Sequence, residues 1–156
     1  MRIRITVATA LLLVSLTALT SAQDREKKIK RSQLPPAVQK TVNEQSKGAI
    51  IRGFSQVREG GQTYYEAEMK VNGHSKDVLM DAHGKVIEVE EEVSLAALPQ
   101  TVRSGLQAQA GTGTIHKVES ITKENKLVAY EAKVVTNGKT SEVQVGPRGQ
   151  PLEHEE

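Results

Sequence analysis

The chain has no cysteine and no tryptophan, and its 156 residues include one phenylalanine and three tyrosines. Without cysteine, a disulfide framework and a thiolate metal site are both excluded. Proteins that bind single-stranded nucleic acid combine a basic groove with stacking aromatic side chains, and here only Phe54, Tyr64, Tyr65 and Tyr130 are available. The composition therefore argues against a nucleic-acid partner.

Recognisable catalytic motifs are also missing. The sequence contains neither a HExxH zinc motif nor a GxSxG nucleophile motif. The stretch GTGTIH, which begins at Gly111, starts like a phosphate loop but lacks the third glycine, and it is expected to end a helix instead of opening one. We therefore expect a protein that is not an enzyme and has no cofactor.

The first 22 residues predict a secretory signal peptide. A basic start with Arg2 and Arg4 precedes fifteen uncharged residues, and small residues lie just before Gln23. We expect cleavage after Ala22 and no transmembrane anchor, because a membrane-spanning helix needs about 20 apolar residues. The mature chain is then periplasmic or secreted. Without the two arginines, 19 basic residues face 19 acidic ones, so the mature chain is nearly neutral.

Residues 23–33 contain little that a fold can bury. The run DREKKIKR, which begins at Asp24, is almost entirely charged, and such segments usually stay solvated. We predict a basic disordered linker here. A basic tether for an acidic lipid or polymer is the alternative interpretation.

The remainder of the chain repeats itself. LPPAVQKTV at Leu34 resembles LPQTVRSGL at Leu98, and YEAEMKVNG at Tyr65 resembles YEAKVVTNG at Tyr130. A fixed period of this kind indicates repeated supersecondary units. We predict two units, residues 34–92 and 93–156, that fold as one body.

Each unit has the pattern of one helix followed by four strands. Leu-Pro opens the helix, and glycine closes it at Gly48 and Gly111. The predicted strands begin with AIIRGFSQV and TIHKVESIT, and the closing LEHEE is expected to end the last strand, with Pro151 placing that strand at an edge. Apolar residues at helical spacing predict the buried side of each helix: Val38, Val42, Ala49, Val102 and Leu106. The fold class is therefore α+β, with tandem αββββ units and both helices on one face of an antiparallel sheet.

Asn-Gly pairs predict the register of one hairpin in each unit. Asn72-Gly73 and Asn137-Gly138 are typical of two-residue hairpin turns, which place Tyr65 opposite Met80. The same register places Ala67 opposite Val78, Ala132 opposite Val143 and Tyr130 opposite Val145. These apolar pairs share one face, which we expect to be the core.

The opposite face of the first unit holds the candidate site. It carries Glu68 directly across from Asp77, an unfavourable like-charge pair. Glu88 extends this acidic row if the turn at Asp81–Gly84 has no bulge. The outward residues that we expect to contact a partner are Tyr64, Glu66, Glu68, Lys70, Asp77 and Leu79.

The histidines are poor metal ligands in this arrangement. His74 and His83 lie at opposite ends of one predicted strand, on the order of 25–30 Å apart, so they cannot share one ion. The stretch DAHG at Asp81 has ordinary turn chemistry. His116 and His154 have no second ligand at a useful spacing. We interpret the histidine-containing stretches as turns and strand ends.

YEAEMKVNG, followed by DVLMDAHGKVIEVE, resembles the PepSY-like family, also called β-lactamase-inhibitor-like. The second unit departs from this pattern, because Gly146 and Pro151 stand where the first unit has Asp81 and Val86. The resemblance implies two tandem helix-and-sheet units and an exported protein. Related domains are associated with binding or restraining peptidases and other envelope enzymes, and the resemblance supplies no catalytic residue.

Two functions remain open from the sequence. The first is an exported, non-enzymatic module that binds or inhibits an envelope protein, such as a hydrolase or peptidase, through the open face of its sheet. The alternative is a periplasmic protein that senses a ligand or weakly binds a divalent cation through Glu68 and Asp77, with Glu88 as a third ligand.

Overall fold

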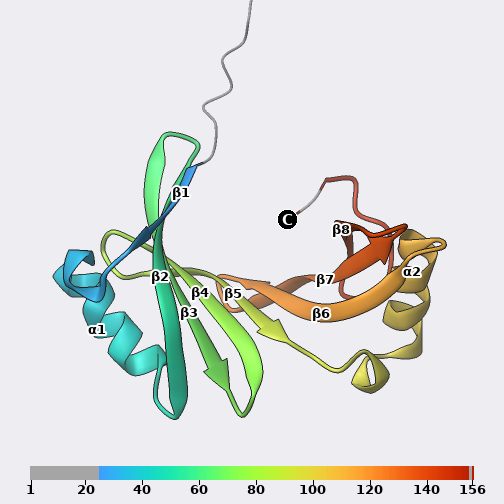
Figure 1. Ribbon diagram of the computed structural model, residues 1–156, viewed down its shortest axis with the longest axis horizontal. Helices are drawn as coiled ribbons and strands as arrows, with labels where there is room; N and C mark the ends of the chain where they lie inside the picture. Colours follow the sequence, from blue (N-terminus) through green and yellow to red (C-terminus); the bar gives the residue numbers. More distant parts are fainter. Residues whose placement is uncertain (1–24, 155) are drawn as a thin grey trace, which may run out of the picture.

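The computed structural model describes residues 25–154 and residue 156 (Figure 1). The predicted signal peptide and its cleavage site lie outside these residues. The strands are β1 (Arg25–Ile29), β2 (Ala49–Glu59), β3 (Gln62–Val71), β4 (His74–Asp81), β5 (Val86–Glu92), β6 (Thr114–Lys123), β7 (Lys126–Thr136) and β8 (Lys139–Val145). The helices are α1 (Pro36–Gln45) and α2 (Gln100–Ala110), with short 3₁₀ helices at Arg31–Gln33 and Leu95–Ala97.

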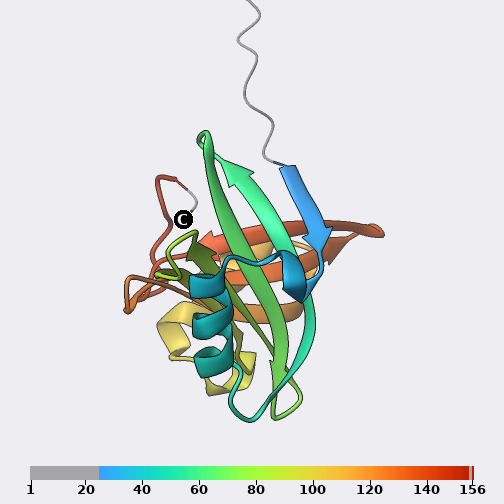
Figure 2. The ribbon, with the colours of Figure 1, turned by 90° about the vertical axis from the view of Figure 1, so that its left-hand side faces the viewer.

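All eight strands form one antiparallel sheet in which each strand pairs with its neighbour in the sequence. The sheet is continuous between the two predicted units, because β5 pairs with β6 from Glu88↔Lys123 to Glu92↔Glu119. In Figures 1 and 2 the strands of the two halves run in steeply different directions, so the sheet is strongly twisted.

The segment predicted to be a disordered linker is instead partly ordered. Residues Arg25–Ile29 form β1, which pairs with β2 along its whole length. Charge did not prevent this, because an edge strand needs only one partner for its backbone, and polar side chains suit its exposed position. Ile29 is the one apolar anchor, and it packs against the first core.

Each half of the sheet has its own apolar core. In the first half, Val38 and Val42 of α1 are fully buried. They belong to a cluster completed by Leu34, Phe54, Ala67, Met69, Val78 and Met80. In the second half, Val102 and Leu106 of α2 are fully buried. Their cluster is completed by Leu98, Val118, Ala132, Val134 and Val145. The burial of these four helix residues was predicted correctly. Ala49, which was predicted to lie on the buried side of the first helix, instead lies at the start of β2 and packs beside the first core.

Both helices lie on the same face of the sheet. Glu91 is opposite Ser120 across the β5–β6 junction, and Ser120 is opposite Tyr130, which packs against the second core. Glu91 in turn pairs with Lys76, whose ammonium group reaches Gln45 of α1. Paired residues share a face, so α1 and α2 cover one face, and the other, which we call the open face, carries neither helix.

The predicted hairpin registers are confirmed. Tyr65 is opposite Met80, Ala67 is opposite Val78 and Tyr130 is opposite Val145. Asn72 and Asn137 have positive φ values of 52° and 51°, as this type of turn requires.

The turn between β4 and β5 is fixed against α1 by a glycine. Gly84 has φ +79°, and a β-carbon there would lie 2.6 Å from the carbonyl oxygen of Ala37. The hydroxyl of Thr41 donates a hydrogen bond of 2.7 Å to the carbonyl of Gly84. Gly149 approaches α2 in the same way, since its β-carbon would lie 2.1 Å from the carbonyl oxygen of Thr101.

The second half is not a full copy of the first. The expected fourth strand through LEHEE is wrong, because after β8 a single bridge pairs Val145 with Pro151. Proline has no N–H to continue a ladder, and residues 152–154 form no strand. The structure therefore shows eight antiparallel strands and two helices, mostly β, without two equal αββββ units. Within the described residues, no helix is long and apolar enough to cross a bilayer.

Candidate functional site: the open face of the sheet

The open face carries a line of carboxylates that crosses most of the sheet. The register pairs Glu68 with Asp77, Asp77 with Glu90, and Glu119 with Glu131. Alternation along each strand adds the remaining members to this face. We call the full set the acidic row: Glu26, Glu66, Glu68, Asp77, Glu88, Glu90, Glu92, Glu119 and Glu131.

The residues predicted to contact a partner all lie on this face. Tyr64, Glu66, Glu68 and Lys70 alternate along β3 with the core residues of that strand, and Asp77 and Leu79 do the same on β4. The structure thus brings the predicted set together. Whether these residues bind a partner stays a prediction.

Lysines of the chain itself neutralise several members of the row. Lys28 of β1 lies 2.8 Å from Glu26 and also pairs with Glu68. On the other half, the ammonium group of Lys117 lies 2.6 Å from a carboxylate oxygen of Glu119.

Two further pairs lie along the face. Lys123 pairs with Glu88 at 3.4 Å, and Lys133 pairs with Glu142 at 3.4 Å, beside the row. Glu92 has no lysine, and instead accepts a hydrogen bond of 2.9 Å from the backbone N–H of Ser75.

Four carboxylates of the row have no such partner. Among the described residues, Glu66, Asp77, Glu90 and Glu131 form no ion pair. Partial burial raises the pKa of Glu66 to about 7, and the charges of Asp77 and Glu26 add to this. These four carboxyl groups therefore have no cation of the chain beside them to stabilise their ionised form.

Glu90 lies at the centre of the acidic row, and its pKa is raised further than that of Glu66. Burial raises its pKa to about 8, and the nearby carboxylates of Glu88, Glu119 and Glu131 raise it further. Burial also raises the pKa of Asp77, to which Glu119 contributes. It raises the pKa of Glu131 as well, against a hydrogen bond from Gln144. At neutral pH the centre of the open face thus holds protons that an arriving cation can displace.

The centre of this face is recessed as well as acidic. Ile121 and Ala129 lie opposite each other on it and are 1% and 0% exposed, although no helix covers them. Glu90, which is opposite Ile121, lines a cavity of about 180 Å³, which we call the open-face cavity. Its lining consists of Val57, Glu66, Asp77, Leu79, Glu88 and Glu90. A second cavity of about 510 Å³ shares Leu79 and Glu88 with it and includes Tyr64 and Lys123.

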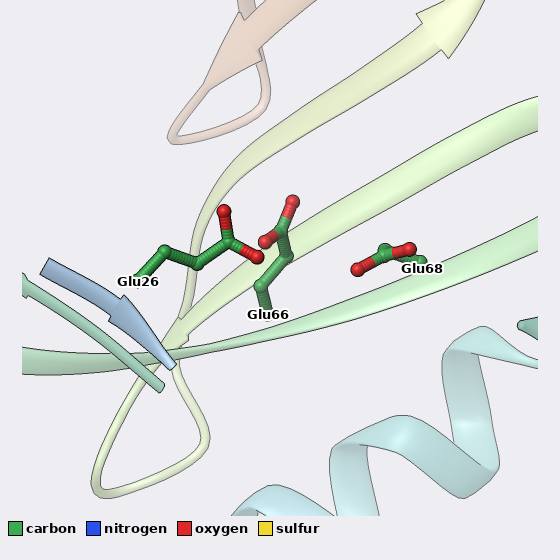
Figure 3. Close-up of side chains that lie close together, drawn as sticks. All are labelled: Glu26, Glu66 and Glu68. Carbon is green, nitrogen blue, oxygen red and sulfur yellow. The ribbon is translucent and has the colours of Figure 1, made fainter. Parts of the chain in front are cut away.

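Two groups of three carboxylates have oxygen atoms within 4.8 Å of one another. Glu26, Glu66 and Glu68 form the first group, and Figure 3 shows the carboxyl groups of Glu26 and Glu66 pointing toward each other between β1 and β3. Asp77, Glu90 and Glu119 form the second group. Three oxygens are fewer than the six to eight that Ca²⁺ takes.

The structure does not bring together Glu68, Asp77 and Glu88, the three residues that the sequence predicted as ligands of a cation. Glu68 belongs to the first group and Asp77 to the second, while Glu88 pairs with Lys123. The ladder between β4 and β5 does contain a bulge, because its register shifts between Leu79 and Met80. This shift puts Glu88 opposite Leu79 and Glu90 opposite Asp77. Glu90 is therefore the residue that extends the row directly from Asp77.

The interpretation as turns and strand ends is confirmed for His83 and His74, whereas His116 lies within β6 and His154 lies in no strand. His83 lies in the turn between β4 and β5, where Asp81 accepts hydrogen bonds of 2.8 and 2.9 Å from the backbone N–H groups of His83 and Lys85. His74 begins β4 after the hairpin turn. No histidine belongs to a potential metal group within residues 25–154.

Several members of the site were missed from the sequence. Glu90 and Glu92 alternate with Val89 in EVEEE, so the period of two was a usable signal. Glu26 was assigned to a linker, and Glu119 and Glu131 join the row through the β5–β6 pairing, which no local pattern specifies.

A scan against protein-family models finds no match for this chain, and a search of curated proteins finds none either. Solved structures do match. A BLIP-like protein of Bacteroides fragilis aligns with a TM-score of 0.57 and 21% identity, covering 77% of this chain and 84% of that chain. A DUF2874 family protein of Bacteroides ovatus aligns with a TM-score of 0.58 and 21% identity, covering 77% and 85%. The chain has a BLIP-like fold.

A third structure agrees with this fold. A protein of Bacteroides eggerthii that is described as periplasmic has a TM-score of 0.62 and 16% identity, with 77% of this chain and 86% of that chain covered. At these identities the likeness shows the fold alone. Membership of the PepSY-like family and two tandem copies stay predictions of the sequence.

Proposed function

We propose that this protein is an exported, non-enzymatic module that binds another exported or envelope protein through the open face of its sheet. The observation that carries the proposal is the combination on that face of a recessed apolar centre with four carboxylates that have no ion-pair partner among the described residues. Carboxyl groups without an ion-pair partner around an apolar centre suit a protein interface, where a polar rim surrounds a desolvated core.

The comparisons support the proposal at the level of fold. One neighbour is described as BLIP-like and another as periplasmic, and none of the three descriptions names an enzyme. With the predicted signal peptide, this favours a periplasmic location. A hydrolase or peptidase of the envelope is the partner class that the family resemblance suggests.

A capture experiment with a blocked face tests this function. We would use the exported protein as bait against the native exported proteome and identify bound proteins by mass spectrometry. Leu79→Arg fills the open-face cavity and should abolish capture, whereas Ala108→Arg places the same side chain on the exposed side of α2 and should leave it unchanged. Excess free protein should compete for the partner. Equal capture by the Leu79→Arg variant would contradict the proposal.

A divalent-cation site is the second candidate function, and the two groups of three carboxylates favour it. A bound ion stabilises the folded state by mass action. If the row holds Ca²⁺ by itself, about 1 mM Ca²⁺ should raise the melting temperature of the wild type. The increase should disappear when Glu66 and Glu90 are both replaced by Gln. An unchanged melting temperature in the wild type would exclude this candidate.

A further inference from the structure

Resting on the proposed function, we propose that the partner inserts a lysine or arginine side chain into the open-face cavity. The aliphatic stem would lie against the apolar floor, and the cationic end would contact the carboxylates around it. Lysine and arginine side chains combine these two properties, since they bury their stems while the charged head stays in a polar environment.

The size and lining of the cavity fit one side chain. Small-molecule pockets usually measure about 300–1,000 Å³, and the open-face cavity is smaller, at about 180 Å³. Val57 and Leu79 supply its apolar surface, and the other four lining residues are all acidic. A neutral or acidic side chain would leave Glu66, Asp77 and Glu90 without a cation, so charge complementarity selects a cation.

Lysines of the protein already contact carboxylates of the acidic row in the way that we propose for the partner's side chain. Lys28 lies on the edge strand β1 and reaches Glu26 and Glu68 with its ammonium group. The same two carboxylates raise the pKa of Lys28, because they stabilise its charged ammonium group. Lys123 contacts Glu88 from the other half of the sheet. The chain's own lysines thus reach the two sides of the row, and the partner's cation would take the centre.

Binding at the centre should release protons. Glu90 faces Asp77 on β4, Glu88 and Glu92 on β5, Glu119 on β6 and Glu131 on β7, with Lys117 beside Glu119 and Lys123 beside Glu88 as the nearby cations.

A cation favours the ionised form of each carboxylate that it contacts. Because burial keeps the pKa of Glu90 at about 8 and that of Glu66 at about 7, a bound cation must displace protons from them at neutral pH. Affinity should therefore rise with pH through this range.

A basic peptide tests the inference directly. The probe is a fluorescent peptide of alternating lysine and threonine, which presents all its lysines on one side when extended. Its binding to the exported protein is followed by anisotropy at low salt. We expect binding that weakens as salt screens the charges and that is tighter by about tenfold at about pH 8.5 than at about pH 6. A peptide with glutamate in place of lysine should not bind.

A charge-matched pair of variants decides the site. Glu66→Gln with Glu90→Gln keeps the shape of the cavity and should weaken peptide binding by about tenfold. It also removes like-charge repulsion, so the variant should fold at least as well as the wild type. Glu44→Gln with Glu91→Gln removes two exposed carboxylates, one from α1 and one from the helix-covered face. This control variant should bind the peptide as tightly as the wild type does. Equal binding by both double variants would overturn the inference.

The same variants separate this inference from the proposed function. If the Leu79→Arg variant loses the exported partner while the Glu66→Gln, Glu90→Gln variant still captures it, the face binds a protein without using a cation, and only the inference fails. If neither variant affects capture, the proposed function fails. If Ca²⁺ raises the melting temperature and the lysine peptide does not bind, the row is a metal site and the inference is overturned.

Discussion

Replacing Glu90 by Gln should make the protein more stable at alkaline pH. Burial among other carboxylates raises the pKa of Glu90 from its ordinary value of 4.5 to about 8. A carboxyl whose pKa is raised by folding contributes stability that is fully present below the unfolded value, and that stability is lost as pH rises to the folded value. The wild type should therefore lose stability between about pH 5 and pH 8, whereas a glutamine at this position loses nothing.

The expected size of this effect follows from the change in pKa. At about 1.4 kcal/mol for each unit of pKa, a rise from 4.5 to about 8 corresponds to about 5 kcal/mol. Water reaches part of this carboxyl, and screening lowers the contribution to about 2 kcal/mol. The free energy of unfolding of Glu90→Gln should thus exceed that of the wild type by about 2 kcal/mol at about pH 9, and by much less at about pH 5.

Urea unfolding followed by circular dichroism measures this difference, since the chain has no tryptophan to report by fluorescence. Glu91→Gln is the control on the neighbouring position, because Glu91 lies on the helix-covered face and pairs with Lys76. We expect its effect to be the same at both pH values. A Glu90→Gln variant whose advantage stays constant across the pH range would refute the reasoning.

Three other predictions concern the second core, the β4–β5 turn and the edge strand. Leu106→Ala empties a fully buried position and should cost about 3 kcal/mol in urea unfolding, whereas Ile50→Ala, at a position 67% exposed, should cost little. Gly84→Ala should lower the free energy of unfolding by about 2 kcal/mol or more, because the new methyl group meets Ala37 at a positive φ. Gly60→Ala, also at positive φ but in open space, should lower it less. Equal losses for the two variants would show that contact with α1 is unimportant. Lys28→Ala should raise the pKa of Glu66 above about 7, because Lys28 lowers it now, and a pH titration of the Glu66 side-chain carboxyl by NMR would detect the change.

Local patterns predicted the hairpins well. Asn72 and Asn137 each determine a two-residue turn, and a turn of known length leaves one register. That register places Glu68 opposite Asp77 and Tyr130 opposite Val145, as observed. The buried sides of both helices also followed from spacing.

Features that depend on strand pairing between distant parts of the sequence could not be predicted from local patterns. β1 is charged and is held by its ladder to β2 and by Ile29, so composition alone indicated a linker. The bulge between Leu79 and Met80 decides which glutamate continues the row, and the turn sequence permits either outcome. Glu119 and Glu131 join the row through the β5–β6 ladder, which the repeat does not specify because it joins one unit to the next. Glu26, Glu119 and Glu131 could therefore not be assigned to the acidic row until the pairing of the whole sheet was known.

The hydrogen bonds between β5 and β6 also have a consequence for how the molecule unfolds. They join two apolar clusters that share no buried residue into one ladder. Loss of either cluster would leave β5 or β6 with a row of unpaired N–H and C=O groups, an exposed edge that favours association between chains. We therefore expect a single cooperative unfolding transition, in which the halves lose structure together. A chain cut after Glu92 would be a self-associating fragment instead of a small independent domain.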